Sequence, residues 1–403
     1  MIVSSEQWLR PKQTDLQAII ETVQSMLKAI ETEGDKKIVE LSQQFDNFDP
    51  EIIQLKNPEE YSLAENTLKH LKIAATRIEK FSRFQMQAYQ NSSFEDEFGT
   101  YGQRIEAIEK IAAYIPGGRF PLASSALMTL IPAKVAGCAT RIAFSPSDHP
   151  AILAAASLAG ATSFIKLGGV QAIAAAALGS SLNEKVDMVV GPGNAYVNAA
   201  KSLLQNQVKI DTQAGPSELL IISDGSTNPD WLIADMKAQA EHDPMALSII
   251  ISWDKRYLES IENCLQNEKE GQCLLNNKQI QLVYAKTSAA AIEFSNKMGA
   301  EHLMLCANDI KTNQLNNYGA LFIGEYSAVA MGDYCSGPNH TLPTGGLSKQ
   351  KGGLQVGDFL RILSFQQLKA SAYPSLGETA VTLAELEDLK NHKLSIDIRM
   401  KNR

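Results

Sequence analysis

The sequence predicts an α/β fold with two domains built around parallel-rich sheets, a helical N-terminal arm and a C-terminal helical tail. From Ile105 onward, short β-branched runs alternate with Ala-rich helical segments, which is typical of βαβ units. Residues 1–104 are instead poor in Gly and carry apolar residues at helical spacing. The length of 403 residues agrees with several domains, at ~150 residues for each.

The domain boundaries follow these changes in composition. The loop Asp211–Pro216 separates the two α/β domains, and helical spacing returns from Asp358 onward. Two helices are expected in the arm, over Asp15–Glu33 and Pro58–Gln90. The expected domains are the arm, the first α/β domain, the second α/β domain and the tail, over residues 1–104, 105–215, 216–357 and 358–403.

Each α/β domain has its own series of short strands. The first is expected to contain strands Arg141–Ser145, Phe164–Leu167 and Val186–Val190. The second is expected to contain strands Leu219–Ser223, Leu247–Ser252, Gln281–Ala285, Leu303–Cys306 and Ala320–Ile323, with helices over Arg256–Lys269 and Ser288–Met298.

Composition excludes several classes of function. The chain has 37 Lys and Arg against 45 Asp and Glu, a net charge of −8, which argues against a nucleic-acid or anionic-membrane binder. No apolar run approaches the ~20 residues that span a bilayer. The five cysteines form no CxxC pair, and their odd number suits a reducing compartment. We therefore expect a cytoplasmic protein.

Histidine placement is the most informative feature of the sequence, because only six histidines occur. His70 lies on a polar helix face and His149 in a turn, so both are expected at the surface. Gln239 and His242 lie three residues apart near the end of a helix that Pro244 stops, so they share a face and are candidates to ligate a divalent metal. The alternative is that His242 only interacts with the last carbonyl groups of the helix.

Two further segments carry candidate catalytic groups. Glu301 and His302 come just before an expected strand, where a carboxylate and an imidazole could accept protons, although an exposed polar turn is equally consistent with the pattern. The Gly- and Pro-rich loop after Met331 contains Asp333 and His340. Its Cys335 is expected to be structural, because no nearby feature lowers the pKa of the thiol.

Glycine-rich loops after apolar runs are candidates for nucleotide binding. Tyr114 begins the loop Y-I-P-G-G, and Asn194 ends the loop G-P-G-N at the start of an expected helix. Free N–H groups at a helix start can hold a pyrophosphate. Neither loop is G-x-G-x-x-G, so on its own the dinucleotide signal is weak. Glu387 and His392 lie in the tail, where a solvated polar face is the default interpretation.

Taken in order, the motifs resemble those of the histidinol dehydrogenase family. They are Y-I-P-G-G, S-A-L-M-x-x-I-P-A-K-V-A-G, G-G-V-Q-A-I-A, G-P-G-N-A-Y-V, A-G-P-S-E, Q-A-E-H-D-P, A-E-H-L, G-D-Y-x-S-G-P-N-H-x-L-P-T and E-x-x-x-x-H, from about Ile105 to His392. The resemblance implies Rossmann-like domains and a homodimer. It also implies NAD as oxidant, one zinc ion per subunit, and oxidation of L-histidinol to L-histidine through the aldehyde.

The resemblance also implies a role for each matching residue. Glu301 and His302 would be the proton acceptors. The zinc ligands would be Gln239, His242, Asp333 and His392; the substrate contacts would be these four with Ser217, His302, His340 and Glu387; and the NAD contacts would be Tyr114, Gln171 and Asn194. Glu387 and His392 would act in the partner subunit's site.

Two other interpretations remain at this point. One keeps zinc and NAD but changes the substrate to another amino alcohol or a sulfonated alcohol; Glu387 favours a cationic amine over a sulfonate. The other is a binding protein without catalysis, against which the acid–base pair Glu301–His302 argues. Arg119 and Phe120 add bulk beside the Y-I-P-G-G loop, where we expect an altered cofactor entrance.

Overall fold

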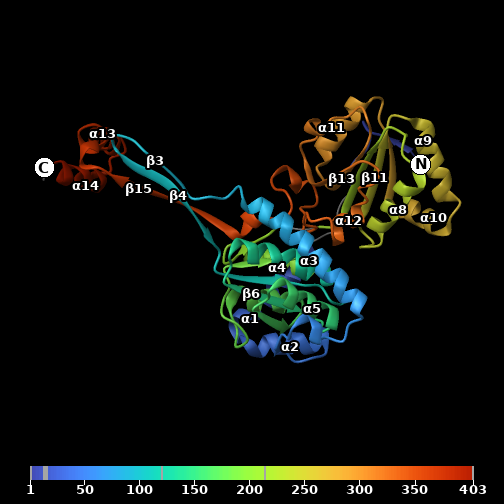
Figure 1. Cartoon of the computed structure of the whole chain (residues 1–403), viewed down its shortest axis with the longest axis horizontal. Helices are drawn as coiled ribbons and strands as arrows, with labels where there is room; N and C mark the ends of the chain where they lie inside the picture. Colours follow the sequence, from blue (N-terminus) through green and yellow to red (C-terminus); the bar gives the residue numbers. More distant parts are fainter. Residues whose placement is uncertain (1, 12–16, 119–120, 213–214, 402–403) are drawn as a thin grey trace. The chain divides into compact units, whose positions relative to one another are not determined.

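The computed structural model describes residues 2–11, 17–118, 121–212 and 215–401. Three predicted features therefore lie wholly or partly outside the described residues. They are the Arg119–Phe120 segment, the middle of the predicted loop Asp211–Pro216, and the start of the predicted helix Asp15–Glu33. Contacts divide the chain into two units (Figure 1). Unit 1 comprises Met1–Gln85 with Ile108–Phe359, and unit 2 comprises Met86–Ala107 with Leu360–Arg403.

The first sheet of unit 1 has the strand order β2-β7-β6-β5-β8-β9, parallel except for β2. Its strands are β2 (Glu51–Ile53), β5 (Lys110–Tyr114), β6 (Thr140–Ser145), β7 (Ser163–Lys166), β8 (Met188–Val190) and β9 (Lys209–Ile210). The three strands expected in this domain are confirmed, whereas β2, β5 and β9 were not predicted.

Helices cover both faces of the first sheet. One face packs against α1 (Gln17–Glu33), α2 (Asp35–Asp46), α6 (Gly169–Leu178) and α7 (Ala195–Leu204). The helices α4 (Ala123–Ala136) and α5 (Pro150–Ala159) pack on each other, and α4 contacts β5 and β6. The long helix α3 spans Glu65–Met86, inside the predicted range. The helices expected in a separate N-terminal arm thus belong to unit 1, together with the first sheet.

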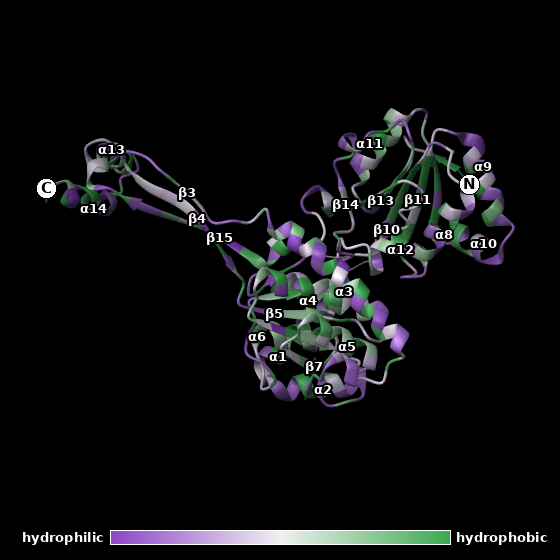
Figure 2. Cartoon of the chain, in the orientation of Figure 1, coloured by the Kyte–Doolittle hydropathy of each residue, from purple (hydrophilic) through white to green (hydrophobic). Residues whose placement is uncertain are grey.

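The second sheet of unit 1 is wholly parallel, in the order β1-β12-β11-β10-β13-β14. Its strands are β1 (Ile2–Ser4), β10 (Glu218–Ser223), β11 (Leu247–Ser252), β12 (Ile280–Tyr284), β13 (Ala300–Cys306) and β14 (Tyr318–Ile323). Every residue of β10, β11 and β13 is buried, and Figure 2 shows the hydrophobic colour along these strands. Parallel strands covered on both faces have this composition.

The helices of the second sheet are α8 (Pro229–Ala240), α9 (Lys255–Gln266), α10 (Lys269–Asn276), α11 (Ser288–Met298) and α12 (Val329–Tyr334). α8, α9 and Val329 of α12 pack on one face, and α11 packs on the other. Short 3-10 helices span Pro58–Glu60, Thr312–Gln314, Leu347–Lys349 and Val356–Phe359. The predicted α/β architecture with parallel-rich sheets is therefore confirmed, and none of the described helices combines the length and apolarity needed to cross a bilayer.

Unit 2 contains an antiparallel sheet that the sequence did not predict. Its strands are β3 (Ser92–Glu95), β4 (Gly99–Ala107) and β15 (Leu360–Leu368), in the order β15-β4-β3. The expectation of helix from Asp358 onward is wrong over β15, because this strand is specified by pairing with β4, which lies far away in the sequence. After it come a 3-10 turn (Ala370–Ala372), a π-helical turn (Tyr373–Gly377), α13 (Glu378–Leu386) and α14 (Lys390–Lys401).

Candidate active site

Four of the predicted site residues come together at the amino-terminal edge of the second sheet. His302 Nδ1 lies 3.6 Å from Glu301 Oε2, and His302 Nε2 lies 3.7 Å from Asp333 Oδ1. His242 Nε2 lies 4.0 Å from Asp333 Oδ2. These distances form a chain of contacts from Glu301 through His302 and Asp333 to His242, with Asp333 between the two histidines.

Glu301 and His302 are the second and third residues of β13, so the exposed-turn interpretation is wrong for both. They are only 6% and 4% exposed. Because both residues are polar, the sequence pattern predicted a strand that begins at Leu303, whereas β13 begins at Ala300. The parallel register places His302 beside Leu219 of β10, next to the connector that carries Ser217.

Burial perturbs the proton affinity of both side chains. Desolvation raises the pKa of Glu301 to about 8, with the charge of His302 opposing and that of Asp333 adding to the shift. Glu301 Oε2 accepts a hydrogen bond from the backbone N–H of Glu218, 2.7 Å away. Desolvation lowers the pKa of His302, but the nearby carboxylates of Glu301 and Asp333 outweigh it, and the net pKa is raised. Both side chains are therefore suited to exchanging protons near neutral pH.

Gln239 lies in the last turn of α8, and His242 follows two residues after this helix ends at Ala240. The helix begins at Pro229 with Asn228 as its cap, whose side chain accepts the N–H of Asp230 at 2.9 Å, as the sequence predicts for a helix start. Gln239 is 2% exposed, and neither its amide oxygen nor its amide nitrogen has a hydrogen-bond partner within the described residues. An unsatisfied buried amide is costly, so this side chain is suited to holding a ligand.

The short helix α12 and the loop after it position Asp333 and His340. His340 Nδ1 lies 2.8 Å from the backbone oxygen of Asp333, and its Nε2 has no partner among the described residues. Desolvation lowers the pKa of His340, which keeps its ring neutral. Burial opposes ionisation of Asp333, but the hydrogen bond and charge of His302 hold its pKa below the ordinary value. Cys335 ends α12 through its N–H, which donates to Met331.

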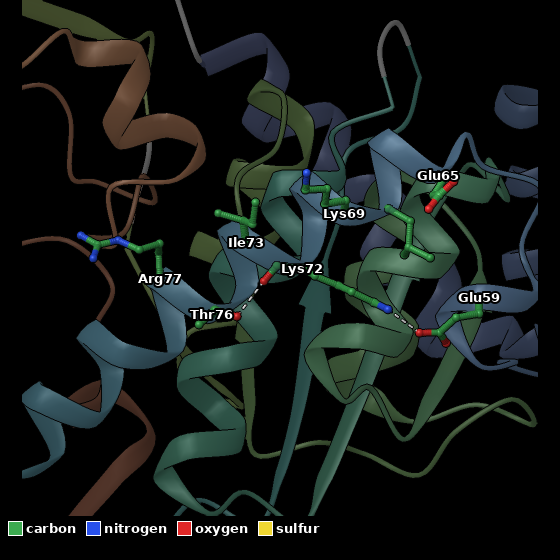
Figure 3. A pocket seen from close by; sticks show the side chains of 8 residues that line it. Glu59, Glu65, Lys69, Lys72, Ile73, Thr76 and Arg77 are labelled. Atoms are coloured by element: carbon green, nitrogen blue, oxygen red, sulfur yellow. Dashed lines mark hydrogen bonds and ion pairs between the residues drawn. The ribbon is translucent and has the colours of Figure 1, made fainter.

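Hydrogen bonds with the helices α3 and α4 fix the loop between Ser336 and His340. Asn339 Nδ2 donates to the backbone oxygen of Met128 in α4 at 2.5 Å. Arg77 Nη2 of α3 donates to the backbone oxygen of Ser336 at 3.1 Å. A groove of about 670 Å³ runs along α3 next to Arg77, lined by Glu59, Glu65, Leu68, Lys69, Lys72, Ile73 and Thr76 (Figure 3). None of the predicted site residues lines this groove.

The three predicted NAD contacts lie at the carboxyl edge of the first sheet. Tyr114 ends β5 and is buried, and its hydroxyl accepts the N–H of Gly169 at 3.2 Å. Desolvation raises the pKa of this hydroxyl to about 12. Gln171 is buried in α6 and donates to Asp46 Oδ2 at 3.0 Å. Asn194 is exposed and caps α7, and its side-chain oxygen accepts two backbone N–H groups of the first turn.

Ser217 lies on the connector before β10, whereas the two predicted tail residues belong to unit 2. Ser217 is half-buried just before β10, and its backbone oxygen accepts the N–H of Leu247 at 2.9 Å. Glu387 caps the end of α13, and His392 lies in the first turn of α14. Both tail side chains are exposed and belong to unit 2.

The donor set in unit 1 suits a zinc ion, although it is incomplete. Gln239 contributes a buried amide oxygen without a partner, His242 an imidazole and Asp333 a carboxylate, and zinc accepts all three donor types. Within the described residues, no three His, Cys, Asp or Glu side chains converge closely enough to hold a metal ion. A tetrahedral site therefore needs a further ligand, which the resemblance assigned to His392.

Sequence comparison decides the family. Residues 9–400 match the family model described as histidinol dehydrogenase. The histidinol dehydrogenase of Methanosarcina mazei is 39% identical over 94% of this chain and 91% of its own length. That of Methanocaldococcus jannaschii is 36% identical over 98% and 96%.

The chain belongs to the histidinol dehydrogenase family. The crystal structure of histidinol dehydrogenase from Elizabethkingia anophelis superposes with a TM-score of 0.87 at 33% identity, covering 98% of this chain and 94% of that one. The predicted family and the α/β fold are thereby confirmed, and the chain is an oxidoreductase of this family.

Several polar residues at the site escaped sequence reasoning. Glu218 supplies the N–H that holds Glu301, and its own carboxylate pairs with Arg10 of the N-terminal segment. Asp46 holds Gln171 from the end of α2. Arg10 and Asp46 have no local signal, because they reach the site only through tertiary structure. Glu218 was part of the quoted motif A-G-P-S-E.

Proposed function

We propose that this chain oxidises L-histidinol to L-histidine through L-histidinal, using NAD and one zinc ion in each site of a homodimer. The observation that carries this proposal is the buried pair Glu301–His302, whose imidazole lies 3.7 Å from Asp333, which in turn lies 4.0 Å from His242. Pure ligand binding needs no such pair of proton acceptors beside a metal-type donor set.

The reaction consumes one histidinol, two NAD⁺ and one water, and yields histidine carboxylate, two NADH and three protons. When bound, NAD would supply the hydride acceptor, and zinc would supply a fixed point that orients the substrate. Gln239, His242 and Asp333 would be the ligands from unit 1. His302 takes the hydroxyl proton as the first hydride leaves, since its neutral ring is a competent base.

The second oxidation needs a water molecule activated against the aldehyde. Glu301 in its ionised form takes a proton from this water, so the hydrate forms and the second hydride can leave. Its pKa of about 8 makes it a stronger base than an ordinary carboxylate. The burial of Glu301 and His302 supports retention of the aldehyde between the two steps.

Unit 2 is the proposed dimerisation element. Its sheet and helices bury few of their own apolar side chains, and the following are exposed: Phe94, Ile362, Leu363, Phe365, Leu368, Leu376, Leu383, Leu386, Leu389, Leu394 and Ile398. An apolar surface of this kind needs cover from another protein surface. A second copy of the chain is the proposed cover, with Glu387 and His392 completing the partner's site.

We also propose that the protein works in the cytoplasm, because all five cysteines are free thiols. The small-molecule partners are then histidinol and NAD, with neither nucleic acid nor membrane involved.

His242→Asn tests the site assignment. The variant removes one imidazole donor, so zinc content after dialysis should fall well below one per chain, and activity with histidinol should fall with it. His149→Asn, at an exposed turn, is the matched control and should retain both. Full zinc retention by the His242 variant would overturn the ligand assignment.

A further inference from the structure

A buried ion pair lies directly beneath the G-P-G-N loop. Lys201 Nζ of α7 pairs with a carboxylate oxygen of Asp211, the residue after β9, and each side chain is only 1% exposed. Burying two charges is costly unless each is paired and hydrogen bonded. The pair is therefore a feature that needs an explanation beyond filling space.

Both members of this pair hold the same residue, Gly191. Lys201 Nζ donates to the backbone oxygen of Gly191 at 2.9 Å, and the N–H of Gly191 donates to Asp211 Oδ2 at 2.7 Å. The second carboxylate oxygen of Asp211 accepts the N–H of Thr212 at 2.8 Å. Both backbone polar groups of one glycine are thus held by a salt bridge.

Gly191 lies where the loop is most constrained. Its φ is +114°, and a Cβ atom there would lie 2.2 Å from the backbone oxygen of Tyr114. Asn198 Nδ2 donates to the backbone oxygen of Gly193 at 2.9 Å, and Asn194 caps the helix. Side chains at the start and in the first turn of α7 therefore hold the G-P-G-N loop, and the ion pair holds Gly191, the first residue of this loop.

Asp211 also links this loop to the connector that leads to β10. Its backbone oxygen accepts a hydrogen bond from Lys351 Nζ at 2.6 Å, and Lys351 pairs with Asp358 at 2.7 Å. The position of Asp211 is therefore set from two sides. A residue held this firmly is suited to transmitting a fixed geometry to the loop that its side chain holds.

We propose that Lys201 and Asp211 are positioning residues for NAD. Their ion pair fixes Gly191, and through it Asn194 and the start of α7, in the geometry that accepts the dinucleotide. The inference rests on the proposed NAD site and adds two residues that do not themselves touch the cofactor. Without the pair, the loop must be ordered each time NAD binds, and that ordering weakens binding.

The test compares the zinc-loaded dimer of the wild type with a double variant and a control variant. Lys201→Met/Asp211→Leu removes both charges while keeping apolar bulk, which for buried pairs is often tolerated by the fold. Its Kd for NAD, measured by calorimetry, should rise about tenfold or more, equivalent to about 1.4 kcal/mol. Its Kd for histidinol and its zinc content should stay as in the wild type. Leu153→Ala in α5 is the control, with lower thermal stability and an unchanged Kd for NAD.

Asp211→Asn and Asn198→Ala keep the inference testable if the double variant does not fold. Each weakens one hold on the loop, so each should raise the Kd for NAD by a smaller factor and leave histidinol binding unchanged. Wild-type NAD affinity in the folded variants, with NAD bound normally by the unaltered protein, would overturn the positioning role alone. Absence of NAD binding by the unaltered protein would overturn the proposed function itself.

Discussion

The substitution Glu301→Gln separates the two oxidations. The structure indicates that glutamine fits without rearrangement, because its amide oxygen can accept the N–H of Glu218, now 2.7 Å from Glu301 Oε2. The amide then faces His302 Nδ1 in place of the carboxylate oxygen at 3.6 Å. What is lost is the ability to take a proton, and a positioned general base contributes about 10²–10⁴-fold.

We therefore expect Glu301→Gln to slow oxidation of added L-histidinal by about 10²–10⁴-fold. The KM for histidinol and the rate of the first hydride transfer should change by only a few-fold. Stopped-flow recording of NADH absorbance, started separately from histidinol and from histidinal, resolves the two steps. Glu241→Gln, an exposed carboxylate beside His242, is the control and should behave as the wild type. A Glu301→Gln enzyme that oxidises histidinal at the wild-type rate would refute the role of Glu301.

Three further predictions concern the tail, the substrate and the support of α12. Subunit exchange between the inactive dimers of His242→Asn and His392→Asn should restore about a quarter of wild-type activity. The reason is that half of the dimers are then mixed, and each mixed dimer has one intact site out of two. No recovery would mean that the tail does not act in the partner's site. Glu387→Gln should raise the KM for histidinol more than it lowers kcat, as expected for loss of a charge that binds the substrate amine, and steady-state kinetics would disprove this by showing the reverse. Asp235 accepts the N–H of Val329, and desolvation raises the pKa of its carboxyl group to about 6. Between the pKa of this group in the unfolded chain and its pKa in the folded protein, the folded protein therefore binds more protons. The free energy of unfolding of the wild type relative to Asp235→Asn should therefore fall by up to about 3 kcal/mol as pH rises from about 4 to about 7, and a pH-independent difference in urea titrations would contradict the burial argument.

Local pattern was sufficient to predict most of the α/β architecture. The predicted bounds of the strand Leu247–Ser252 and of the helix Ser288–Met298 agree with those of β11 and α11. Both elements could be predicted because the local pattern of apolar residues specifies the buried surface of each. The strands β3, β4 and β15 could not be predicted in this way. Their pairing joins residues 92–107 to residues 360–368, and no local periodicity encodes a contact over that separation.

The candidate site shows the same division. Gln239 and His242 were predicted to share a helix face because three residues separate them, but α8 ends at Ala240, so only Gln239 lies on the helix and His242 follows it. Glu301 and His302 could be singled out as chemical groups, but their place inside a buried strand could not, because polar residues at a strand start resemble a turn. Lys201 resembles a surface lysine in an amphipathic helix. Only the fold brings it to Asp211, and so its role is visible only in three dimensions.

The number of NADH molecules formed per molecule of L-histidinol consumed tests the proposed four-electron oxidation most directly. NADH absorbance at limiting histidinol should show two NADH per histidinol. This yield should be lost when a zinc chelator is present and restored by added zinc. One NADH with accumulation of free histidinal would contradict the second oxidation and the role of Glu301 in it. No NADH from histidinol, with zinc still bound, would contradict the proposed substrate.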